Sequence, residues 1–309
     1  MPAGGTGLVL RGLRKEPAAI GKWHLGWDWT HKEGKAKTVD NIDFTKRVAN
    51  GPTDRGFDYF YGLTSPSGPP HLYMVNDMAE KQPNTRFEES GGGLYKIKGG
   101  IGHSDWSADG MQPHLADKML EYLDENKDSD KPFFLYMALT APHIPLFPSK
   151  EFKGKSKIGD YGDLVMMIDD IVGRVNRKLK EIGKYDNTIV MFAADNGCAG
   201  YINMDRINRK GHYPSYIYRG YKSHGWEGGH RIPFILSWGD RYGHVTDNSL
   251  VSLTDLYATF ADMLGYRMAD DEAEDSFSFW PILDGSGNSV RAQHAIKYIT
   301  NKLGLNLFG

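Results

Sequence analysis

The sequence predicts an α/β fold with a mostly parallel central sheet and helices on both faces. Two short, continuous apolar runs at 133–139 and 188–194 are typical of strands that are buried on both sides. Between them, residues 160–182 carry the strongest helical pattern in the chain. A strand, a helix and a second strand at this spacing indicate a βαβ unit, in which the two strands run parallel.

The first third of the chain has weaker patterns. Residues 1–20 are rich in glycine and show no clear strand or helix, so we expect an irregular segment there. Residues 27–110 are dense in turn-forming and aromatic residues, which predicts mostly loops with short elements near 57–61 and 72–75. A long irregular stretch of this kind in a compact domain is usually functional or poorly ordered.

The pattern sharpens from residue 111. A helix is predicted to begin there, with Asp109 as its N-cap, from apolar residues at helical spacing: Met111, Leu115, Met119, Leu120 and Leu123. The helix at 160–182 carries a single apolar stripe, which consists of Leu164, Val165, Ile168, Ile171, Val172, Val175, Leu179 and Ile182. Burial of such side chains contributes roughly 1.5–3 kcal/mol each, so this helix is expected to be a main structural element.

Two further elements complete the predicted fold. Residues 232–238 form an apolar run that is closed by Gly239, as expected of a third buried strand. Residues 252–264 have the pattern of a helix. The acidic segment at 269–275 is expected to be an exposed loop.

Composition places the chain among globular proteins and excludes several other classes. Of its 309 residues, 40% are hydrophobic and 25% are charged, and a net charge of −2 gives no general footprint for nucleic acid. The apolar runs are too short to span a bilayer. Cys198 is the sole cysteine, which excludes a disulfide framework and a cysteine-based zinc site. The first residues lack the basic and apolar regions of a signal peptide, so the sequence as written predicts no secretion signal.

Two groups of candidate functional residues directly follow predicted strands. His143, between two prolines, follows the strand at 133–139, and Asp195 with Asn196 follows the strand at 188–194. Ligands of parallel sheets bind beyond the carboxyl ends of the strands, so both groups are expected at that edge. A carboxylate and an amide oxygen suit a hard cation such as calcium or magnesium. The alternatives are a plain Asp-Asn-Gly turn and a connector with an incidental histidine.

Lys22 and His24 form a second type of candidate. They are two residues apart, so in an extended segment they project to one side while Trp23 packs inward between them. A lysine can bind an anion, and a histidine can exchange a proton near neutral pH. The alternative is an exposed loop that is anchored by an aromatic residue.

Lys222 precedes a glycine-containing turn at 227–229. The glycines permit close backbone approach, and Glu227 and Arg231 are expected to pair and brace the turn. A solvated lysine beside an ordinary turn is the alternative. Weaker candidates, for which surface or packing roles are the alternative, are His103 with Asp105, His212, His224, and the aromatic residues Trp27, Trp29, Tyr59, Phe60 and Tyr61.

Six short motifs together resemble the type I sulfatases, the formylglycine-dependent branch of the alkaline phosphatase superfamily. The resemblance covers about residues 20–290, and it rests on the order of the motifs more than on any one of them. The motifs are GKWHLG at 21–26, GFDYFYG at 56–62, APHIP at 141–145, YGDLVMMIDDIVGRV at 161–175, ADNG at 194–197 and KSHGWEGGHRIP at 222–233.

The resemblance implies catalytic roles for four of the candidates. Lys22 and His24 are similar to a pair that binds the sulfate group and steadies the formylglycine. Lys222 is similar to a second sulfate-binding lysine. His143 is similar to a histidine near the oxygen of the leaving group. In this family a hydrated formylglycine attacks sulfur and displaces the alcohol.

The resemblance also implies a calcium ion. Asp195 and Asn196 are similar to one half of the family's calcium site. The metal and the lysines would offset negative charge on the sulfuryl oxygens, which is a form of electrostatic preorganisation.

Two features of the family are missing from this sequence. No Asp-Asp strand end precedes Gly21, and the family's nucleophile motif, Cys-x-Pro-Ser-Arg or Ser-x-Pro-Ser-Arg, does not occur. Cys198 lies in a different motif. The interpretation is a sulfatase sequence that is truncated at both ends, with an irregular segment at 1–20, a sulfatase-like domain at 21–290 and a divergent tail at 291–309. Weak calcium binding and little turnover by this chain alone are therefore expected.

The function that the resemblance implies is hydrolysis of sulfate esters, with a sulfated small molecule or glycan as partner. A carbohydrate substrate is expected from the similarity to bacterial sulfatases. One alternative is an inactive sulfatase-like fragment or pseudoenzyme that binds anionic glycans. A further alternative is a phosphatase or phosphodiesterase of the same superfamily, against which the Asp-Asn pair and the lysines argue.

Overall fold

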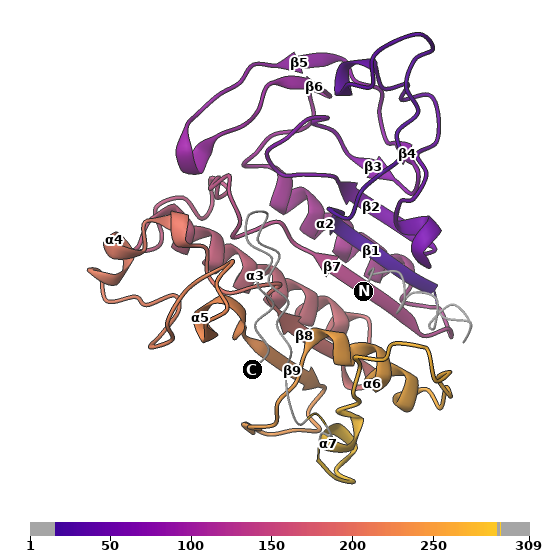
Figure 1. Ribbon diagram of the computed structural model, residues 1–309. Helices are drawn as coiled ribbons and strands as arrows, with labels where there is room; N and C mark the ends of the chain where they lie inside the picture. The colour runs from indigo at the N-terminus through magenta and orange to yellow at the C-terminus, as the bar shows by residue number, and fades with distance from the viewer. Residues whose placement is uncertain (1–15, 289–290, 292–309) are drawn as a thin grey trace. The chain divides into compact units, whose positions relative to one another are not determined.

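The computed structural model describes residues 16–288 and Arg291, which are divided into two compact units (Figure 1). The first unit contains residues 16–186, and the second contains residues 187–288 and Arg291. No helix in these described ranges is long and apolar enough to cross a membrane.

The first unit is built on a mixed five-stranded sheet with the strand order β4-β3-β2-β1-β7. β1 (Glu16–Lys22) is parallel to both of its neighbours, β2 (Tyr59–Leu63) and β7 (Phe133–Ala138). The short strands β3 (Met74–Val75) and β4 (Met78–Ala79) extend the β2 edge in antiparallel fashion. The central part of the sheet is therefore parallel, as the sequence predicts, and its edge is antiparallel.

β1 corrects the prediction that residues 1–20 are irregular. The strand begins at residue 16 and lies between β2 and β7, and its residues Ala18, Ala19 and Ile20 are at most 1% exposed. Its sequence, EPAAIGK, contains a proline and two alanines, which are poor strand formers. Pairing on both sides and complete burial outweigh this weak local preference. Residues 1–15 lie outside the described residues.

Two glycines allow the three parallel strands to lie close together near their carboxyl ends. Gly21 has a φ of +130°, and a Cβ placed there would lie 2.0 Å from the carbonyl oxygen of Ala138. A Cβ on Gly62 would lie 1.8 Å from the carbonyl oxygen of Gly21. Any side chain at these two positions would push the strands apart. Glycine is therefore required at this point of the motifs GKWHLG and GFDYFYG.

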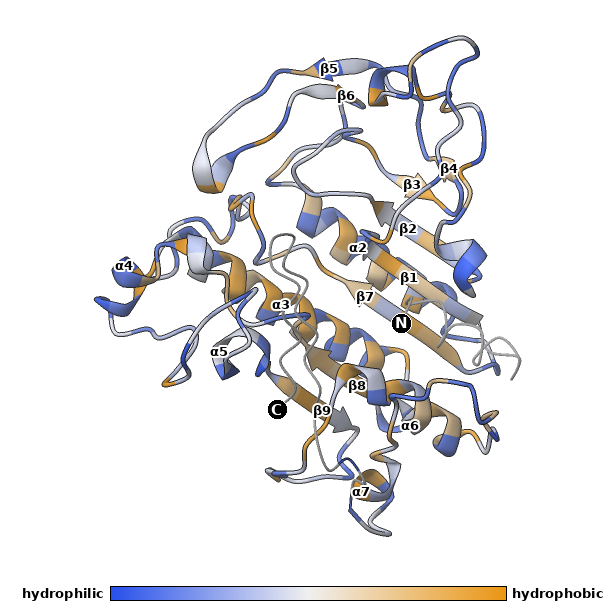
Figure 2. Ribbon diagram, in the orientation of Figure 1, coloured by the Kyte–Doolittle hydropathy of each residue, from blue (hydrophilic) through white to orange (hydrophobic). Residues whose placement is uncertain are grey.

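Two long helices pack in the first unit, close to their predicted positions. α2 (Met111–Glu125) begins after Gly110 rather than after Asp109, and it buries Leu115, Met119 and Leu123. Of its predicted stripe, α3 (Asp160–Glu181) buries Leu164, Ile168, Ile171, Val175 and Leu179. Val172 is half-buried, Val165 is 41% exposed, and Ile182 lies just beyond the helix. α2 contacts α3 and β1. Figure 2 shows the alternation of apolar and polar residues along α3 that produces this packing.

The remaining part of the first unit is mostly loop, as the sequence predicts for residues 27–110. It contains one hairpin, β5 (Thr85–Phe87) with β6 (Gly100–Gly102), and single-turn 3-10 helices at Val39–Asn41, Pro52–Arg55 and Gly93–Tyr95. Contacts between aromatic side chains, more than strand pairing, hold this region together. For example, the indoles of Trp27 and Trp29 stack with 5.7 Å between ring centroids.

The second unit contains the predicted strands as an antiparallel pair. β8 (Ile189–Ala193) pairs with β9 (Phe234–Trp238), whereas a parallel arrangement was expected. The prediction failed because an apolar run indicates a strand without specifying its direction or its partners. β8 is half-buried and belongs to a different sheet from β7, so the predicted burial on both faces and the βαβ unit that joins these two strands are wrong. Between the strands lie one 3-10 helix (Gly200–Ile202) and two short helices, α4 (Met204–Asn208) and α5 (Glu227–His230).

A helix follows where residues 252–264 were predicted to be helical. It starts as a 3-10 turn (Leu253–Asp255) and continues as α6 (Leu256–Met263), and Ser252 with Asp255 forms a capping box at its start. α7 (Trp280–Asp284) packs against α6.

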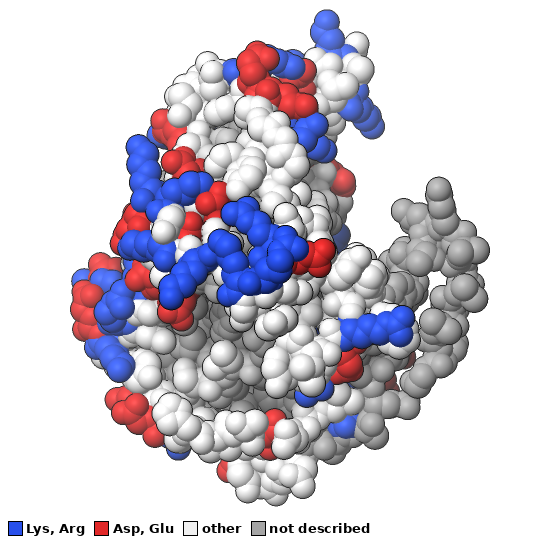
Figure 3. Space-filling view, turned by 90° about the vertical axis from the view of Figure 1, so that its left-hand side faces the viewer, with Lys and Arg blue, Asp and Glu red and all other residues white. Residues whose placement is uncertain are grey.

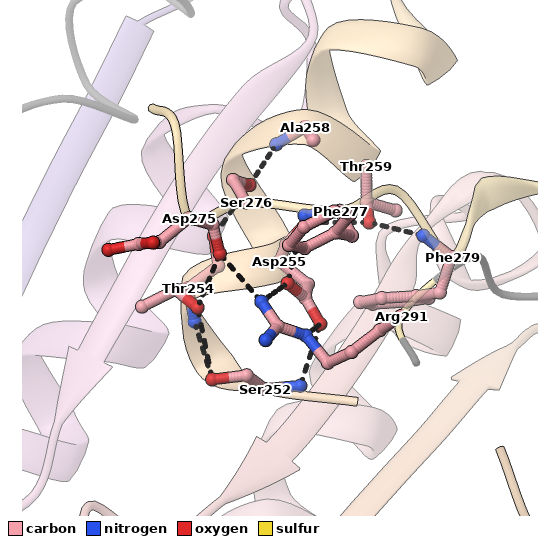
Figure 4. A network of polar contacts seen from close by, with 10 residues as sticks. All are labelled: Ser252, Thr254, Asp255, Ala258, Thr259, Asp275, Ser276, Phe277, Phe279 and Arg291. Atoms are coloured by element: carbon pink, nitrogen blue, oxygen red, sulfur yellow. Dashed lines mark hydrogen bonds and ion pairs between the residues drawn. The ribbon is translucent and has the colours of Figure 1, made fainter. Parts of the chain in front are cut away.

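A buried ion pair holds the end of the second unit (Figure 4). The carboxylate of Asp255 is fully buried, and Arg291 donates to it from Nε at 2.8 Å and from Nη2 at 2.6 Å. The same carboxylate accepts from the backbone N–H groups of Ser252 and Phe277. Arg291 thus belongs to the second unit and not to a divergent tail. The rest of that predicted tail, 292–309, lies outside the described residues.

Candidate functional site

Lys22 and His24 lie at the carboxyl end of β1, and a buried tryptophan fixes the backbone between them. Trp23 is only 3% exposed, and its backbone N–H donates to the carbonyl of Leu63 at 2.9 Å. Its ring meets Phe57 edge-on at 6.2 Å between centroids. Lys22 is half-buried and His24 is exposed. Trp23 therefore packs inward as the sequence predicts, with its two polar neighbours turned the other way.

His143 follows the carboxyl end of β7. Its backbone N–H donates to Thr140 at 3.2 Å, and its ring Nδ1 lies 2.6 Å from the carbonyl oxygen of Ile144. A carbonyl oxygen only accepts hydrogen bonds, so this contact assigns a proton to Nδ1. The other ring nitrogen, Nε2, is then the atom through which the half-buried imidazole can take up or give a proton.

The sheet brings these three residues to one edge of the first unit. β1 and β7 are parallel neighbours, and Gly21 lies opposite Ala138 in their register. Their carboxyl ends therefore lie side by side, where ligands of parallel strands usually bind. A lysine and two histidines at this position can bind an anion and exchange a proton with it.

In the second unit, Asp195 and Asn196 follow β8. The carboxylate of Asp195 is exposed, and Asn196 is half-buried. The side-chain nitrogen of Asn196 donates to the carbonyl of Gly197 at 2.9 Å, which leaves its side-chain oxygen as the atom suited to a cation.

The backbone joins this loop to the segment that contains Lys222. The N–H of Lys222 donates to the carbonyl of Cys198 at 2.8 Å, and the N–H of Gly197 donates to Gly229 at 2.9 Å. A Cβ on Gly197 would lie 2.0 Å from the carbonyl oxygen of Gly228, so the two segments touch through glycines. The motifs ADNG and KSHGWEGGHRIP, which are separated by more than twenty residues, thus form one contiguous structure.

A salt bridge braces the turn after Lys222. Glu227 and Arg231 pair at 3.0 Å across one turn of helix, as the sequence predicts. The Arg231 guanidinium also lies over the ring of Tyr218, 4.7 Å from its centroid. The half-buried Lys222 itself is held by its backbone hydrogen bond to Cys198 and not by this pair.

The six predicted site residues are divided equally between the two units. Lys22, His24 and His143 belong to the first unit, and Asp195, Asn196 and Lys222 belong to the second. Within each unit the three residues lie on adjoining segments. That all six residues form a single site stays a prediction.

The weaker candidates have packing or surface roles in the structure. His103 lies 3.5 Å from Asp105, whose pKa is lowered mainly by a hydrogen bond from Lys81. The ring of His224 lies against that of Tyr221, with 4.0 Å between centroids. Tyr61, for which a packing role was the alternative, is buried and donates to Glu80 at 2.8 Å.

Sequence reasoning missed a cavity of about 550 Å³ in the first unit. Its walls include Phe87, Trp106 and Phe147, and its rim carries Lys150 and Lys153. The run of four lysines between residues 150 and 157 was the signal that could have indicated it. The aromatic walls come from distant parts of the chain and leave no local pattern.

The oxygen atoms of Asp195 and Asn196 are of the kind that a hard cation prefers, but they are too few to complete its coordination shell. Among residues 16–288 and Arg291, no group of three or more His, Cys, Asp or Glu side chains is placed to hold a metal ion. Calcium takes six to eight oxygen ligands, and Asp195 with Asn196 would supply only part of such a shell.

Comparison with known proteins identifies the family. The sulfatase family model matches residues 9–266. The chain belongs to the sulfatase family, and its fold is that of sulfatases, α/β with a mixed sheet.

Similar proteins include carbohydrate and aryl sulfatases. The chain is 28% identical to an N-acetylgalactosamine-6-O-sulfatase of Bacteroides thetaiotaomicron over 93% of its own length and 61% of the relative's. It is 30% identical to an arylsulfatase of Hemicentrotus pulcherrimus over 87% of its own length and 44% of the relative's. The chain thus spans about half of the length of the curated relatives that it matches.

A solved structure shows the same fold over nearly the whole chain. It comes from work on the metabolism of multiple glycosaminoglycans by Bacteroides thetaiotaomicron, with a TM-score of 0.76 and 26% sequence identity. The match covers 93% of this chain and 65% of the solved one. A sulfatase from Pseudoalteromonas sp. matches with a TM-score of 0.61, 26% identity, and coverage of 84% of this chain and 50% of that one.

Proposed function

We propose that this chain carries the sulfate-binding residues of an enzyme that hydrolyses sulfate esters of carbohydrates. The observation that supports this most directly is the position of Lys22, His24 and His143 at one carboxyl edge of the parallel strands in a sulfatase-family fold. The carbohydrate sulfatases among its relatives favour a sugar sulfate as the substrate.

The cationic groups of the edge would bind the negatively charged sulfate group. Lys22 is half-buried, which reduces screening of its charge by water. A lysine about 4 Å from a negative charge gains roughly 4 kcal/mol at an effective dielectric constant near 20. Lys222 would supply a second such charge, as the resemblance implies, and loss of either lysine is expected to weaken sulfate binding.

His143 would act on the oxygen of the leaving alcohol. Hydrolysis breaks the bond between sulfur and that oxygen, which must then receive a proton to become a hydroxyl group. The contact of Nδ1 with the Ile144 carbonyl leaves Nε2 of the imidazolium as the donor of this proton. In the family, the oxygen that attacks sulfur would be supplied by the hydrated formylglycine. No residue of this sequence is assigned that role.

Asp195 and Asn196 would contribute oxygen ligands to a calcium ion. When bound, such an ion supplies positive charge beside the sulfuryl oxygens. The backbone contacts of Gly197 and Cys198 hold the loop that follows β8 beside the Lys222 segment, so the oxygen ligands and the lysine would come from adjoining segments.

The proposal is tested by binding and by turnover. Isothermal titration measures binding of N-acetylgalactosamine 6-sulfate to the chain and to K22A, with K37A, an exposed lysine in the same unit, as the control. K22A is expected to weaken binding about tenfold, which corresponds to 1.4 kcal/mol, and K37A less than twofold. Equal effects of both variants would contradict a specific role for Lys22.

A double variant, K22A/K222A, asks whether the two units act on one ligand. Residues that share a ligand show a coupling free energy above about 0.5 kcal/mol, whereas independent residues add within that range. Strict additivity in the titration would separate the two groups of residues and remove Lys222 from the proposed site.

Turnover distinguishes the alternatives. Release of sulfate from the same sugar and of 4-nitrophenol from 4-nitrophenyl sulfate is measured beside hydrolysis of 4-nitrophenyl phosphate. Preference for the sulfate esters supports the proposal, and preference for the phosphate ester favours a phosphatase of the same superfamily. Tight binding without any release favours a glycan-binding pseudoenzyme.

A further inference from the structure

The cavity of the first unit has the dimensions and the chemistry of a ligand site, although none of the six predicted site residues lines it. Its volume, about 550 Å³, lies within the range of 300–1,000 Å³ that is usual for small-molecule sites. All of its lining residues belong to the first unit, between Phe87 and Lys153.

Three aromatic residues form the apolar part of the wall. Trp106 is 4% exposed and packs edge-on against Phe87, with 5.5 Å between ring centroids. On the other side, the ring of Phe147 meets that of Tyr95 edge-on at 5.8 Å. Because each ring is held by another aromatic residue, the wall is preformed, and the half-buried rings of Phe87 and Phe147 present its apolar surface over the buried Trp106. Such surface suits the C–H faces of a sugar ring.

Lysines gather at the rim. The loop between β7 and α3 carries four exposed lysines in eight residues, namely Lys150, Lys153, Lys155 and Lys157. Figure 3 shows lysine and arginine side chains gathered on the face of the molecule that it draws.

The two lysines that line the cavity differ in their surroundings. Lys153 pairs with Asp160 at 2.6 Å and lies 5.9 Å from the centroid of the Tyr95 ring. Its charge is thus partly balanced. Lys150 is exposed, and no ion pair engages it among the described residues. Lys150 is therefore the charge that a negatively charged ligand would meet first.

Carboxylates complete the set of polar groups. Glu88 and Asp109 also line the cavity. Carboxylates accept hydrogen bonds from hydroxyl groups, and lysines donate to anions. A ligand that carries both hydroxyl groups and a negative charge satisfies this lining better than a purely apolar or a purely anionic one.

The cavity lies beside the strand edge that holds Lys22, His24 and His143. Phe147 is four residues beyond His143, so the two backbones are at most about 14 Å apart. The opposite wall is tied to loops that follow the same edge: the N–H of Lys98 donates to Ser67 after β2, and the N–H of Leu146 donates to Leu94. An oligosaccharide that reaches the edge with one residue can reach the cavity with another.

We propose that this cavity is a subsite for a neighbouring residue of an anionic oligosaccharide, with Lys150 binding its sulfate or carboxylate group and the aromatic wall packing against its ring. The inference rests on the proposed function, because it assumes that the sulfate group to be cleaved lies at the strand edge. It adds the length and the charge of the substrate that the protein would prefer.

Titration with a chondroitin 6-sulfate tetrasaccharide and with N-acetylgalactosamine 6-sulfate tests the subsite on the intact chain. K150A is expected to weaken binding of the tetrasaccharide at least fivefold and to leave binding of the monosaccharide within twofold. Phe147→Leu, which keeps an apolar side chain but removes the flat ring, is expected to act in the same direction. A chondroitin 6-sulfate tetrasaccharide whose uronic carboxylates are reduced to hydroxymethyl groups keeps the sulfates and identifies the anionic group: retained sensitivity to K150A assigns the sulfate, and lost sensitivity assigns the carboxylate.

K155A is the matched control, because Lys155 lies on the same loop without lining the cavity and rests 4.8 Å from the Phe152 ring centroid. It is expected to change tetrasaccharide binding less than twofold. Equal losses in K150A and K155A would reduce the effect to general charge attraction and overturn the subsite. Normal monosaccharide binding with no effect of K150A on the tetrasaccharide would overturn the subsite alone. Tetrasaccharide binding that depends on Lys150 but not on Lys22 would keep the subsite and overturn the proposed function. A chain that binds neither sugar overturns both.

Discussion

The two units hold their candidate residues by different physical means. In the first unit, Lys22 is the last residue of β1 and is fixed by the strand ladder, in which Gly21 lies opposite Ala138. His143 follows β7 in a short loop that is tied back by its N–H bond to Thr140. In the second unit, Asp195 and Lys222 lie on irregular backbone that is joined by single hydrogen bonds and by glycine contacts. A strand ladder distributes its constraint over many bonds, whereas a glycine contact concentrates it on one atom. We therefore expect the second unit to depend on fewer, more critical positions.

The largest expected effect is the loss of the buried arginine in the second unit. Arg291→Met leaves the fully buried carboxylate of Asp255 without its charged partner, and breaking such a pair costs about 3–5 kcal/mol. Urea unfolding followed by the fluorescence of Trp238 and Trp280 measures the loss. Arg267→Met, at an exposed position of the same unit, is the control and should cost less than about 0.5 kcal/mol. Comparable losses in both variants would show that the ion pair is not what holds this unit.

Substitution of matched glycines tests the comparison between the units directly. Gly62→Ala places a Cβ 1.8 Å from a backbone oxygen in the first unit, and Gly228→Ala places one 2.3 Å from the Gly220 oxygen in the second. Each is expected to cost at least about 1–3 kcal/mol, because backbone must move. Hydrogen exchange at the N–H groups of Trp23 and Lys222 reports the two units separately.

The glycine controls come from positions where a Cβ has room. A Cβ on Gly51 would lie 3.5 Å from the Trp27 ring, and one on Gly243 would meet nothing within 4 Å. Both alanine variants should exchange as the unchanged chain does. If Gly228→Ala left the exchange of the Lys222 amide unaltered, the glycine contacts would not be what positions that lysine.

Much of the fold was predictable because apolar periodicity reports burial. The stripe of α3 and the strands β7, β8 and β9 were predicted within about two residues of their observed bounds. β1 was missed because alanine and proline give no strand signal, and only its two neighbours make it a strand. The antiparallel pairing of β8 with β9 was missed for a related reason, since an apolar run does not specify the direction of a strand.

The candidate site was predictable in its parts but not in its arrangement. Trp23 between Lys22 and His24, and the pair of Glu227 with Arg231, follow from local spacing. The contact of Gly197 with Gly229 and the cavity around Trp106 depend on segments that are distant in sequence, so no local pattern contains them. The order of the motifs indicated the family, whereas the contacts between distant segments are determined by tertiary packing.

Acid is expected to weaken the first unit through two histidines. Burial lowers the pKa of His71, which is 1% exposed, and of His114, whose ring contacts the Tyr61 hydroxyl at 2.6 Å. In the unfolded chain both titrate near 6.5 and bind protons that the folded state binds less well. The free energy of unfolding is therefore kept above pH 6.5 and decreases as the pH falls below it, by up to about 1.4 kcal/mol per pH unit for each histidine.

Urea unfolding between pH 7.5 and 5.0 measures this slope. His114→Gln, which keeps a hydrogen-bonding group beside Tyr61 without a titrating ring, should make the slope shallower. Thr38→Ser, at an exposed position of the same unit that does not titrate, is the control and should leave it as it is. A His114→Gln slope equal to that of the unchanged chain would place the acid sensitivity elsewhere.

The smallest expected effect concerns the brace beside Lys222. Glu227 and Arg231 are both more than half exposed, and pairs of this kind contribute only about 0.3–0.5 kcal/mol to stability. Glu227→Gln should therefore leave the free energy of unfolding nearly unchanged. Because the glycine contacts and the hydrogen bond to Cys198 hold the Lys222 backbone, its amide exchange should also stay the same. Exchange that becomes faster in Glu227→Gln, to the extent seen in Gly228→Ala, would show that surface charge and not backbone packing fixes this lysine, and the contrast between the units would lose its basis.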